Sequence, residues 1–195
     1  MRRPFVFICL CILNLLIYNA SAYNLKQIAD KEYMSNSSLK SLCQDERGLM
    51  WIGTCDGLNI YDGQEIEEFK TRDKEDYLSG NLIDNIVYTG EDIYWIQTYY
   101  GLNRLDRRTN AITHYNEFQK LFFMNKDNNG NLFIIQDSNC IYYYHKKEGV
   151  FRKINITGIP ISDIVDFFID ATNRMWVVMK GYNRCYDIQQ EPTSG

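Results

Sequence analysis

The chain has 195 residues, of which 45% are hydrophobic and 14% aromatic, and its formal net charge is −4. Acidic residues outnumber basic ones and no basic stripe is present, which argues against nucleic acid or an anionic membrane surface as a partner. Only three prolines occur, and no segment of useful length has helical periodicity. These patterns favour an all-β fold.

Residues 1–22 have the features of an export signal. Arg2 and Arg3 precede an apolar run over residues 5–17, and the segment ends in Ala-Ser-Ala. We predict cleavage before Tyr23, and we expect the protein to be exported. The alternative is an uncleaved anchor, although a membrane span needs about 20 apolar residues. Loss of the two arginines changes the net charge from −4 to −6.

The first repeat unit, residues 38–70, predicts short strands joined by tight turns. Asp45 to Gly48 form one turn, because Gly tolerates positive φ and Asp bonds the backbone that follows it. Asp56-Gly57 is a strong hairpin signal. The four expected strands are Leu39–Gln44, Leu49–Thr54, Leu58–Tyr61 and Glu65–Lys70.

This unit recurs three times when the copies are aligned on one aromatic residue. The anchors Trp51, Trp95, Phe133 and Trp176 are separated by 44, 38 and 43 residues. A period near forty with four short strands is typical of a β-propeller blade, so we expect the anchors to pack between blades. The other positions that mark the repeat are Asp45, Gly48, Gly57, Asp62, Gly101, Asp106, Asp127, Gly130 and Asp187, while the third copy ends at Tyr144 and has Asn139 in place of Gly.

We expect the later blades at residues 81–116, 121–155 and 161–190. Their expected strands include Asn81–Tyr88, Ala111–Tyr115, Leu121–Met124, Leu132–Gln136, Ile141–His145, Val150–Ile154, Ile164–Ile169, Met175–Met179 and Arg184–Ile188. No fourth strand is expected in residues 189–195. We therefore predict a partial β-propeller of about four four-stranded antiparallel blades, from an amino-terminal fragment whose open ends need missing blades or a homodimer partner.

The pattern D-x-x-G-x-x-W-I-G-T…G-L-N-x-x-D resembles the two-component regulator propeller repeat. The resemblance covers roughly residues 38–190, and the first two copies carry it best. It implies the periplasmic sensor region of a Bacteroides-type hybrid two-component system, of the hybrid histidine kinase type. The ligand implied is an oligosaccharide, and the membrane is reached only through downstream regions. The kinase, receiver and DNA-binding parts of that family are absent, so no enzyme activity is expected.

The residues that usually carry catalysis or bind metals are scattered. His114 and His145 are isolated and have no Glu partner at metalloprotease spacing. The run Asp127–Asn131 faintly resembles a calcium loop, but it lacks the Glu at the twelfth position and occupies the turn position of the repeat. There is neither a nucleophile elbow nor a phosphate-binding glycine loop. We therefore predict no catalytic residue, no metal and no cofactor.

Four cysteines follow the leader, and their spacing matches no metal motif. They are Cys43, Cys55, Cys140 and Cys185. A disulfide between Cys43 and Cys55 is one interpretation, although the hairpin register brings Cys43 nearer to Trp51. The other interpretation is that all four are small buried hydrophobic residues.

The residues that break the repeat in exposed loops are the candidates for ligand binding. Tyr99-Tyr100 replaces Cys55-Asp56, and an aromatic pair could stack on a sugar ring or simply cover the neighbouring blade. Arg104 could bond sugar hydroxyls, but Arg184 near the same repeat position favours a structural role. The alternative functions are a protein-interaction propeller and a propeller enzyme, either a polysaccharide lyase or a quinone-dependent dehydrogenase. Such enzymes need a cluster of His, Arg or metal ligands near the axis.

Overall fold

The computed structural model describes residues 34–69, 77–119, 123–136, 140–156 and 158–188. These all lie in the second of two compact units, residues 31–195. The predicted leader, residues 121–122 of one expected strand, Asn139 and the tail 189–195 lie outside the described residues. Within those ranges the regular elements are fifteen strands and one turn of 3-10 helix, which confirms the all-β prediction.

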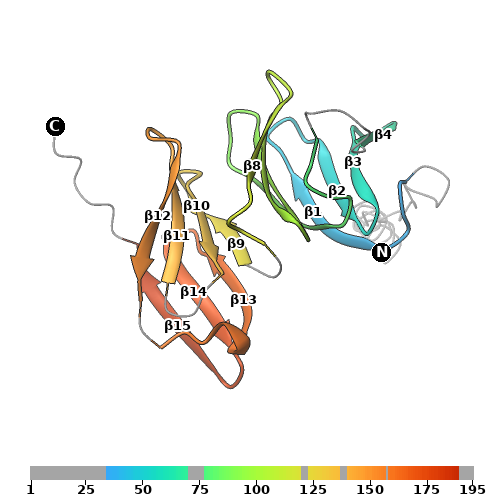
Figure 1. Cartoon of the computed structure of the whole chain (residues 1–195). Helices are drawn as coiled ribbons and strands as arrows, with labels where there is room; N and C mark the ends of the chain where they lie inside the picture. Colours follow the sequence, from blue (N-terminus) through green and yellow to red (C-terminus); the bar gives the residue numbers. More distant parts are fainter. Residues whose placement is uncertain (1–33, 70–76, 120–122, 137–139, 157, 189–195) are drawn as a thin grey trace, which may run out of the picture. The chain divides into compact units, whose positions relative to one another are not determined.

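The strands form four antiparallel sheets that follow one another along the chain (Figure 1). The first sheet contains β1 (Leu39–Gln44), β2 (Met50–Thr54), β3 (Gly57–Tyr61) and β4 (Ile66–Phe69). The second contains β5 (Ile83–Tyr88), β6 (Ile93–Thr98), β7 (Gly101–Asp106) and β8 (Ala111–Tyr115). The third contains β9 (Phe123–Lys126), β10 (Leu132–Ile135), β11 (Cys140–His145) and β12 (Val150–Asn155). The fourth contains β13 (Ile164–Ile169), β14 (Arg174–Met179) and β15 (Tyr182–Asp187), preceded by η1 (Ile161–Asp163).

The first strand of each sheet contacts the first strand of the next. β1 adjoins β5, β5 adjoins β9, and β9 adjoins β13. These four inner strands are the arrangement expected around a propeller axis, with each sheet as one blade. The prediction of a partial propeller of about four blades is confirmed, with three strands of the fourth blade described.

The same turn recurs in three copies of the repeat, because in each copy an aspartate carboxylate accepts hydrogen bonds from two backbone amides. Asp45 Oδ1 accepts hydrogen bonds from the amides two and four residues later, each at 2.9 Å. Asp127 and Asp170 make the same pair of bonds in the third and fourth copies. Gly48 completes the first turn with φ of 82°, and Asn173 takes the left-handed conformation in the fourth. The repeat pattern therefore fixes the turn geometry locally.

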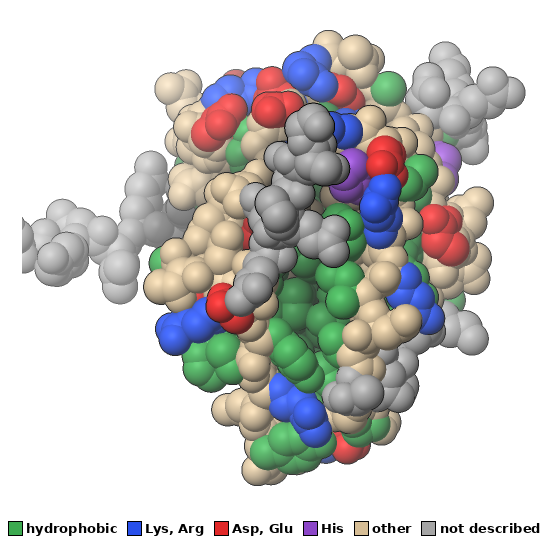
Figure 2. Space-filling model, turned by 90° about the vertical axis from the view of Figure 1, so that its left-hand side faces the viewer, with side chains coloured by type: hydrophobic (Ala, Val, Ile, Leu, Met, Phe, Trp, Pro, Cys, Tyr) green, Lys and Arg blue, Asp and Glu red, His purple; other side chains and the backbone are tan. Residues whose placement is uncertain are grey.

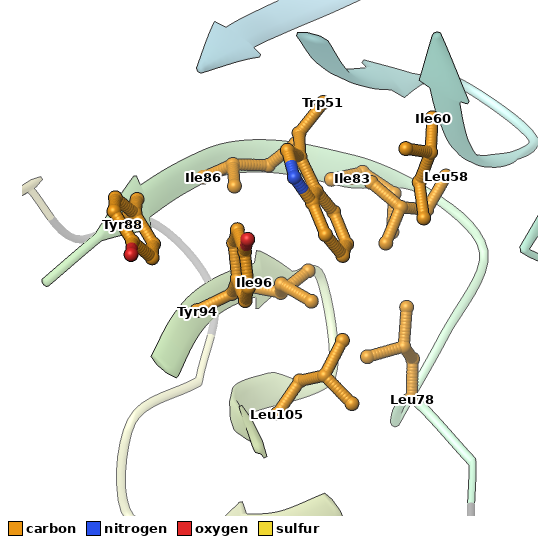
Figure 3. Packing of buried hydrophobic residues seen from close by; sticks show 10 residues of the cluster. All are labelled: Trp51, Leu58, Ile60, Leu78, Ile83, Ile86, Tyr88, Tyr94, Ile96 and Leu105. Carbon is orange, nitrogen blue, oxygen red and sulfur yellow. The ribbon is translucent and has the colours of Figure 1, made fainter. Parts of the chain in front are cut away.

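The core consists of three hydrophobic clusters, one at each joint between successive blades. In the first, Trp51 is fully buried and its ring centroid lies 3.8 Å from that of Tyr94 in the next blade. Figure 3 shows the Trp51 indole directed toward Tyr94 and Ile96. Trp95 is buried in the second cluster, and Phe133 in the third.

The third hairpin is one residue longer than the others. Phe133 pairs with Tyr143, ten positions later. Trp51 pairs with Ile60, only nine positions later. The assumption that the third copy keeps the spacing of the first is therefore wrong, and the repeat position of Asp62 shifts from Tyr144 to the residue after it. Residues 137–139, between β10 and β11, lie outside the described residues.

Candidate functional site

A groove of about 720 Å³ runs along the four inner strands. This volume lies within the range of small-molecule sites, about 300–1,000 Å³. A second hollow, of about 660 Å³, adjoins it where Tyr88 and Lys126 line both. Polar side chains that line the groove include Lys40, Asp84, Asn85, Asn125, Lys126 and Asp166.

Irregularities in the inner strands lie beside several of these side chains. The pairing of β5 with β6 shifts between Ile83 and Asn85, and the pairing of β13 with β14 shifts between Ile164 and Asp166. An extra residue in one strand bends it and re-aims the neighbouring side chains. Asp84, Asn85 and Asp166, which lie at these shifts, all line the groove.

Two asparagines tie neighbouring inner strands together across the groove. The Asn85 side-chain amide donates to the Met124 carbonyl oxygen at 3.4 Å, and that of Asn125 donates to the Phe167 carbonyl oxygen at 3.2 Å. Each side-chain oxygen also accepts a 2.8 Å bond from the following backbone amide. The two side chains are therefore held in fixed orientations that span blades two to four.

The charges along the groove balance. Lys40 Nζ lies 3.7 Å from Asp84 Oδ1, and the Lys126 ammonium lies 5.5 Å from the centroid of the Tyr88 ring. Asp166 accepts a 2.7 Å bond from the amide of the next residue. Burial and the Glu46 carboxylate raise the pKa of Tyr88 to about 12, so its phenol stays neutral at physiological pH. The two lysines and the two aspartates of the groove carry opposite charges that cancel. The groove therefore has little net electrostatic attraction for a charged ligand.

The two exposed tyrosines have different surroundings: Tyr99 lines the groove, and Tyr100 lies beside Gly80. Tyr99 is 55% exposed and lines the groove. Its ring meets that of Tyr100 edge-on, with centroids 5.3 Å apart. Tyr100 instead lies over Gly80, which precedes β5. A Cβ added at Gly80 would lie 2.8 Å from the Tyr100 ring. Tyr99 is therefore the ligand candidate that the fold brings to the groove.

Arg104 does not line the groove. It lies in β7 between Trp95 and Thr113, and its Nε is buried without a hydrogen-bond partner. Arg184 pairs with Val177, whereas Cys185 pairs with the anchor of the fourth blade. Neighbouring residues of a strand face opposite sides, so Arg184 does not share the position of Arg104. The two arginines do not share a repeat position, so the prediction of a common structural role is wrong.

The repeat-motif carboxylates support turns and anchors. Asp45 accepts bonds from the Trp51 indole at 3.2 Å and from the Tyr94 hydroxyl at 2.7 Å. Asp170 accepts from the Trp176 indole at 2.9 Å, and its pKa is lowered, first by the Thr172 hydroxyl and then by this indole.

The remaining motif positions lie at hairpins and outer turns. The carbonyls of Gly57 and Gly101 accept from the Thr54 and Thr98 hydroxyls at 2.9 and 3.1 Å. Backbone amides at Glu65 and Gln64 lower the pKa of Asp62, and the Arg108 side chain lowers that of Asp106. Asp187 pairs with Arg174 at the end of the last described hairpin, and Gly130 lies against the Thr89 backbone of the preceding blade.

A buried polar network was missed by the sequence interpretation. Ser35 donates its amide to Asn59 Oδ1 at 3.0 Å, and its hydroxyl lies 2.9 Å from that of Thr54. Ser79 repeats both contacts in blade two with Asn103 and with the corresponding threonine, at 2.8 and 2.6 Å. The two serines are 44 residues apart, the same step as the first two anchors. That step was the signal that could have revealed them.

Cys43, Cys55, Cys140 and Cys185 form no disulfide with one another. Cys140 is buried, while Cys185 is exposed on β15. The interpretation of four buried hydrophobic residues is therefore wrong for Cys185, which pairs with the anchor of the last described blade. Among the residues that the structure describes, no group of three or more His, Cys, Asp or Glu could hold a metal ion.

Residues 33–56 match the family model described as "Two component regulator propeller". The match covers the turn at Asp45, the anchor Trp51, and Ser35 and Thr54 of the polar network. This segment of the chain is similar to the two component regulator propeller repeat. The resemblance seen in the sequence is confirmed, although the matched segment is a small part of the chain. No curated protein matches the sequence.

Two solved structures with this fold are extracellular domains of hybrid two component systems from B. thetaiotaomicron. One has a TM-score of 0.68 at 18% identity, over 83% of this chain and 25% of that domain. The other has a TM-score of 0.60 at 22% identity, over 82% and 25%. The chain thus spans about a quarter of the length of these domains.

The fold also resembles that of a lyase. Virginiamycin B lyase from Staphylococcus aureus matches with a TM-score of 0.56 at 12% identity, over 81% of this chain and 57% of the lyase. At these identities the likeness shows the propeller fold alone. Within the described part of the chain, no helix is long and apolar enough to cross a membrane.

Proposed function

We propose that this chain is a ligand-sensing propeller segment of a two-component regulator, exported to the periplasm, and that its groove binds a neutral oligosaccharide. The observation that carries the proposal is the groove itself, which combines fixed amides, balanced charges and an exposed aromatic rim. The regulator-propeller match and the two extracellular domains of the same fold support the setting.

The groove chemistry suits a sugar better than an ion. Hydroxyl groups both donate and accept hydrogen bonds, and the charged side chains along the groove supply both kinds of partner. Lys40 and Lys126 offer donors, while Asp84 and Asp166 offer acceptors. The exposed ring of Tyr99 supplies an apolar face at the rim. The two carboxylates would repel a polyanion, and the two ammonium groups would repel a polycation.

Signalling requires the ligand to prefer one arrangement of the blades. The Asn85 and Asn125 amides join blade two to blade three and blade three to blade four. A sugar that contacts these inner strands therefore binds several blades at once. Its differential affinity would stabilise one relative placement of the blades, without any catalytic step in this chain.

The test is a glycan array probed with the full chain, followed by isothermal titration of each oligosaccharide that binds. We expect saturable binding of a neutral sugar, and Tyr99→Ala should weaken it about five- to tenfold, or ~1–1.4 kcal/mol. The matched control is Tyr182→Ala, because Tyr182 is 46% exposed outside the groove. Binding of charged glycans only, or equal losses in both variants, would contradict the assignment.

A further inference from the structure

Three of the four inner strands carry one extra residue at the same place. The pairing of β1 with β2 skips Lys40, that of β5 with β6 skips Asp84, and that of β13 with β14 skips Val165. Each of the residues 40, 84 and 165 lies eleven positions before the anchor of its blade, at 51, 95 and 176. In the third blade this place falls on residue 122, outside the described residues. We call this place the bulge position.

The backbone at the bulge position repeats, but the side chain there does not. The anchors are aromatic in all four blades, whereas the bulge position has a lysine in blade one, an aspartate in blade two and a valine in blade four. An extra residue in a strand re-aims its side chain, and such bulges are common beside active sites. Lys40 and Asp84 both line the groove. One repeated irregularity therefore presents a different chemical group from each of these two blades.

The first two bulge residues meet across the joint between blades one and two. Lys40 Nζ lies 3.7 Å from Asp84 Oδ1, and the two side chains are 44% and 31% exposed. This separation is longer than a direct hydrogen bond of about 2.7–3.2 Å, so a ligand hydroxyl can accept from the ammonium and donate to the carboxylate. Ion pairs exposed to this extent add little to stability. Binding therefore explains the contact better than folding does.

The pair lies at the end of the groove where Tyr99 is. In blade two, Ile83 pairs with Thr98. Asp84 follows the first of these residues and Tyr99 follows the second, and both line the groove. A sugar ring that stacks on Tyr99 therefore has the two bulge residues at the same end of the groove.

We propose that the bulge position selects the ligand, and that Lys40 and Asp84 together restrict the groove to sugars without a net charge. Lys126 and Asp166 line the groove with opposite charges of their own, so the loss of either bulge residue's charge leaves one unit of charge uncompensated. A groove with an uncompensated charge attracts ligands of the opposite sign. The inference rests on the proposed function, because it assigns the specificity of the same groove.

The test is a glycan array of matched neutral, uronic-acid and amino-sugar oligomers, probed with the full chain and its variants. Asp84→Asn should raise the affinity for uronic-acid oligomers about three- to tenfold relative to neutral ones. Lys40→Gln should raise the affinity for amino-sugar oligomers by a similar factor, because it leaves the opposite charge uncompensated.

Two control variants make the same changes in net charge outside the groove. They are Glu67→Gln on β4 and Lys147→Gln in the turn after β11, both at exposed residues. Positive and negative side chains are interspersed on the face of the molecule shown in Figure 2. One charge lost from such an outer surface should leave the selectivity of the groove unchanged.

A double variant tests whether the balance of charge at the bulge position decides the selectivity. Lys40→Asp combined with Asp84→Lys exchanges the two charges and should return the preference to neutral oligomers. A double variant that prefers charged oligomers would overturn the proposal. So would single variants that shift in the same direction, or shifts no larger than those of the controls. If circular dichroism shows that a single variant is unfolded, Asp84→Ser or Lys40→Met replaces it, with the same outcomes.

The array also separates this inference from the proposed function. If the natural chain binds no neutral oligomer while the single variants gain oligomers of opposite charge, the bulge assignment stands and the neutral ligand is wrong. If the natural chain binds neutral oligomers and no variant shifts its selectivity, the neutral ligand stands and the bulge assignment is wrong. Binding by none of the proteins would overturn both.

Discussion

The hydroxyl of Tyr94 in blade two donates a 2.7 Å hydrogen bond to the carboxylate of Asp45 in blade one. The two residues are 49 positions apart, and the same carboxylate also binds the Trp51 indole. One buried acidic group therefore closes its own turn, orients the anchor and links two blades. Burial and this carboxylate raise the pKa of Tyr94, so the phenol remains a donor at physiological pH.

The first prediction concerns this link between blades. Tyr94→Phe keeps the ring in the first cluster but removes the donor, so we expect a loss of about 1.5–3 kcal/mol in the free energy of unfolding. Tyr61→Phe is the control, because its exposed hydroxyl binds only the Gly63 carbonyl and should cost less than about 0.5 kcal/mol. Urea denaturation measures both. Equal costs would contradict a special role for the Asp45 bond.

The second prediction concerns acid. Burial alone would raise the pKa of Asp45, but the hydrogen bonds from Tyr94 and Trp51 outweigh it and the pKa is lowered. A lowered pKa adds stability above the usual Asp value of about 3.9, and this is lost as the pH falls through the folded-state value. The stability difference between the natural chain and Asp45→Asn should therefore change little between pH 7 and about 5 and shrink as the pH is lowered below about 4. Urea midpoints at each pH measure it, and a constant difference would disprove it.

The third prediction tests the serine–asparagine network. Asn59 accepts from the Ser35 amide and donates to the Ser35 hydroxyl at 2.8 Å, and it is fully buried. Asn59→Ala removes the acceptor of the Ser35 amide, at a cost of about 1–3 kcal/mol, while the Ser35 hydroxyl keeps its contact with Thr54. Asn183→Ala at an exposed position of β15 should be nearly neutral. Thermal and urea unfolding of both variants would show whether the network stabilises blade one.

The fourth prediction compares two glycines in the same repeat position. Gly48 and Gly130 have φ of 82° and 71°, so an alanine is strained at both. A Cβ on Gly130 would also collide with the Thr89 carbonyl of the preceding blade, whereas near Gly48 only the Gln44 amide lies within 4 Å. Gly130→Ala should therefore cost about 1–3 kcal/mol more than Gly48→Ala. Similar losses in urea denaturation would rule out a tight contact between blades.

The sequence predicted what is set locally. Asp45, Gly48 and Trp51 lie within seven residues, and their turn recurs often enough to reveal the period and the blades. The spacing failed at Phe133, because the one extra residue lies in a degraded hairpin whose turn carries no Gly signal. Arg184 was misplaced for a similar reason, since a one-residue offset moves a strand side chain to the other face.

The groove could not be predicted in the same way. Its lining comes from Lys40, Asp84, Lys126 and Asp166, which lie on four strands roughly forty residues apart. Asn85 and Asn125 make equivalent bonds to the next blade, but they do not occupy the same position relative to their anchors. A search for repeats therefore misses them. The residues reach one surface only because the inner strands β1, β5, β9 and β13 pack side by side in the folded chain.

The most direct test of the account is hydrogen exchange of the full chain with and without a bound neutral oligosaccharide. If the groove is the sensing site, amides in β5 and β9 should gain protection, while those in β4 and β12 at the outer edge should not change. Tyr99→Ala should reduce the protection at the same sugar concentration. Protection confined to the outer strands, or binding with no change in β5 and β9, would contradict the central claim.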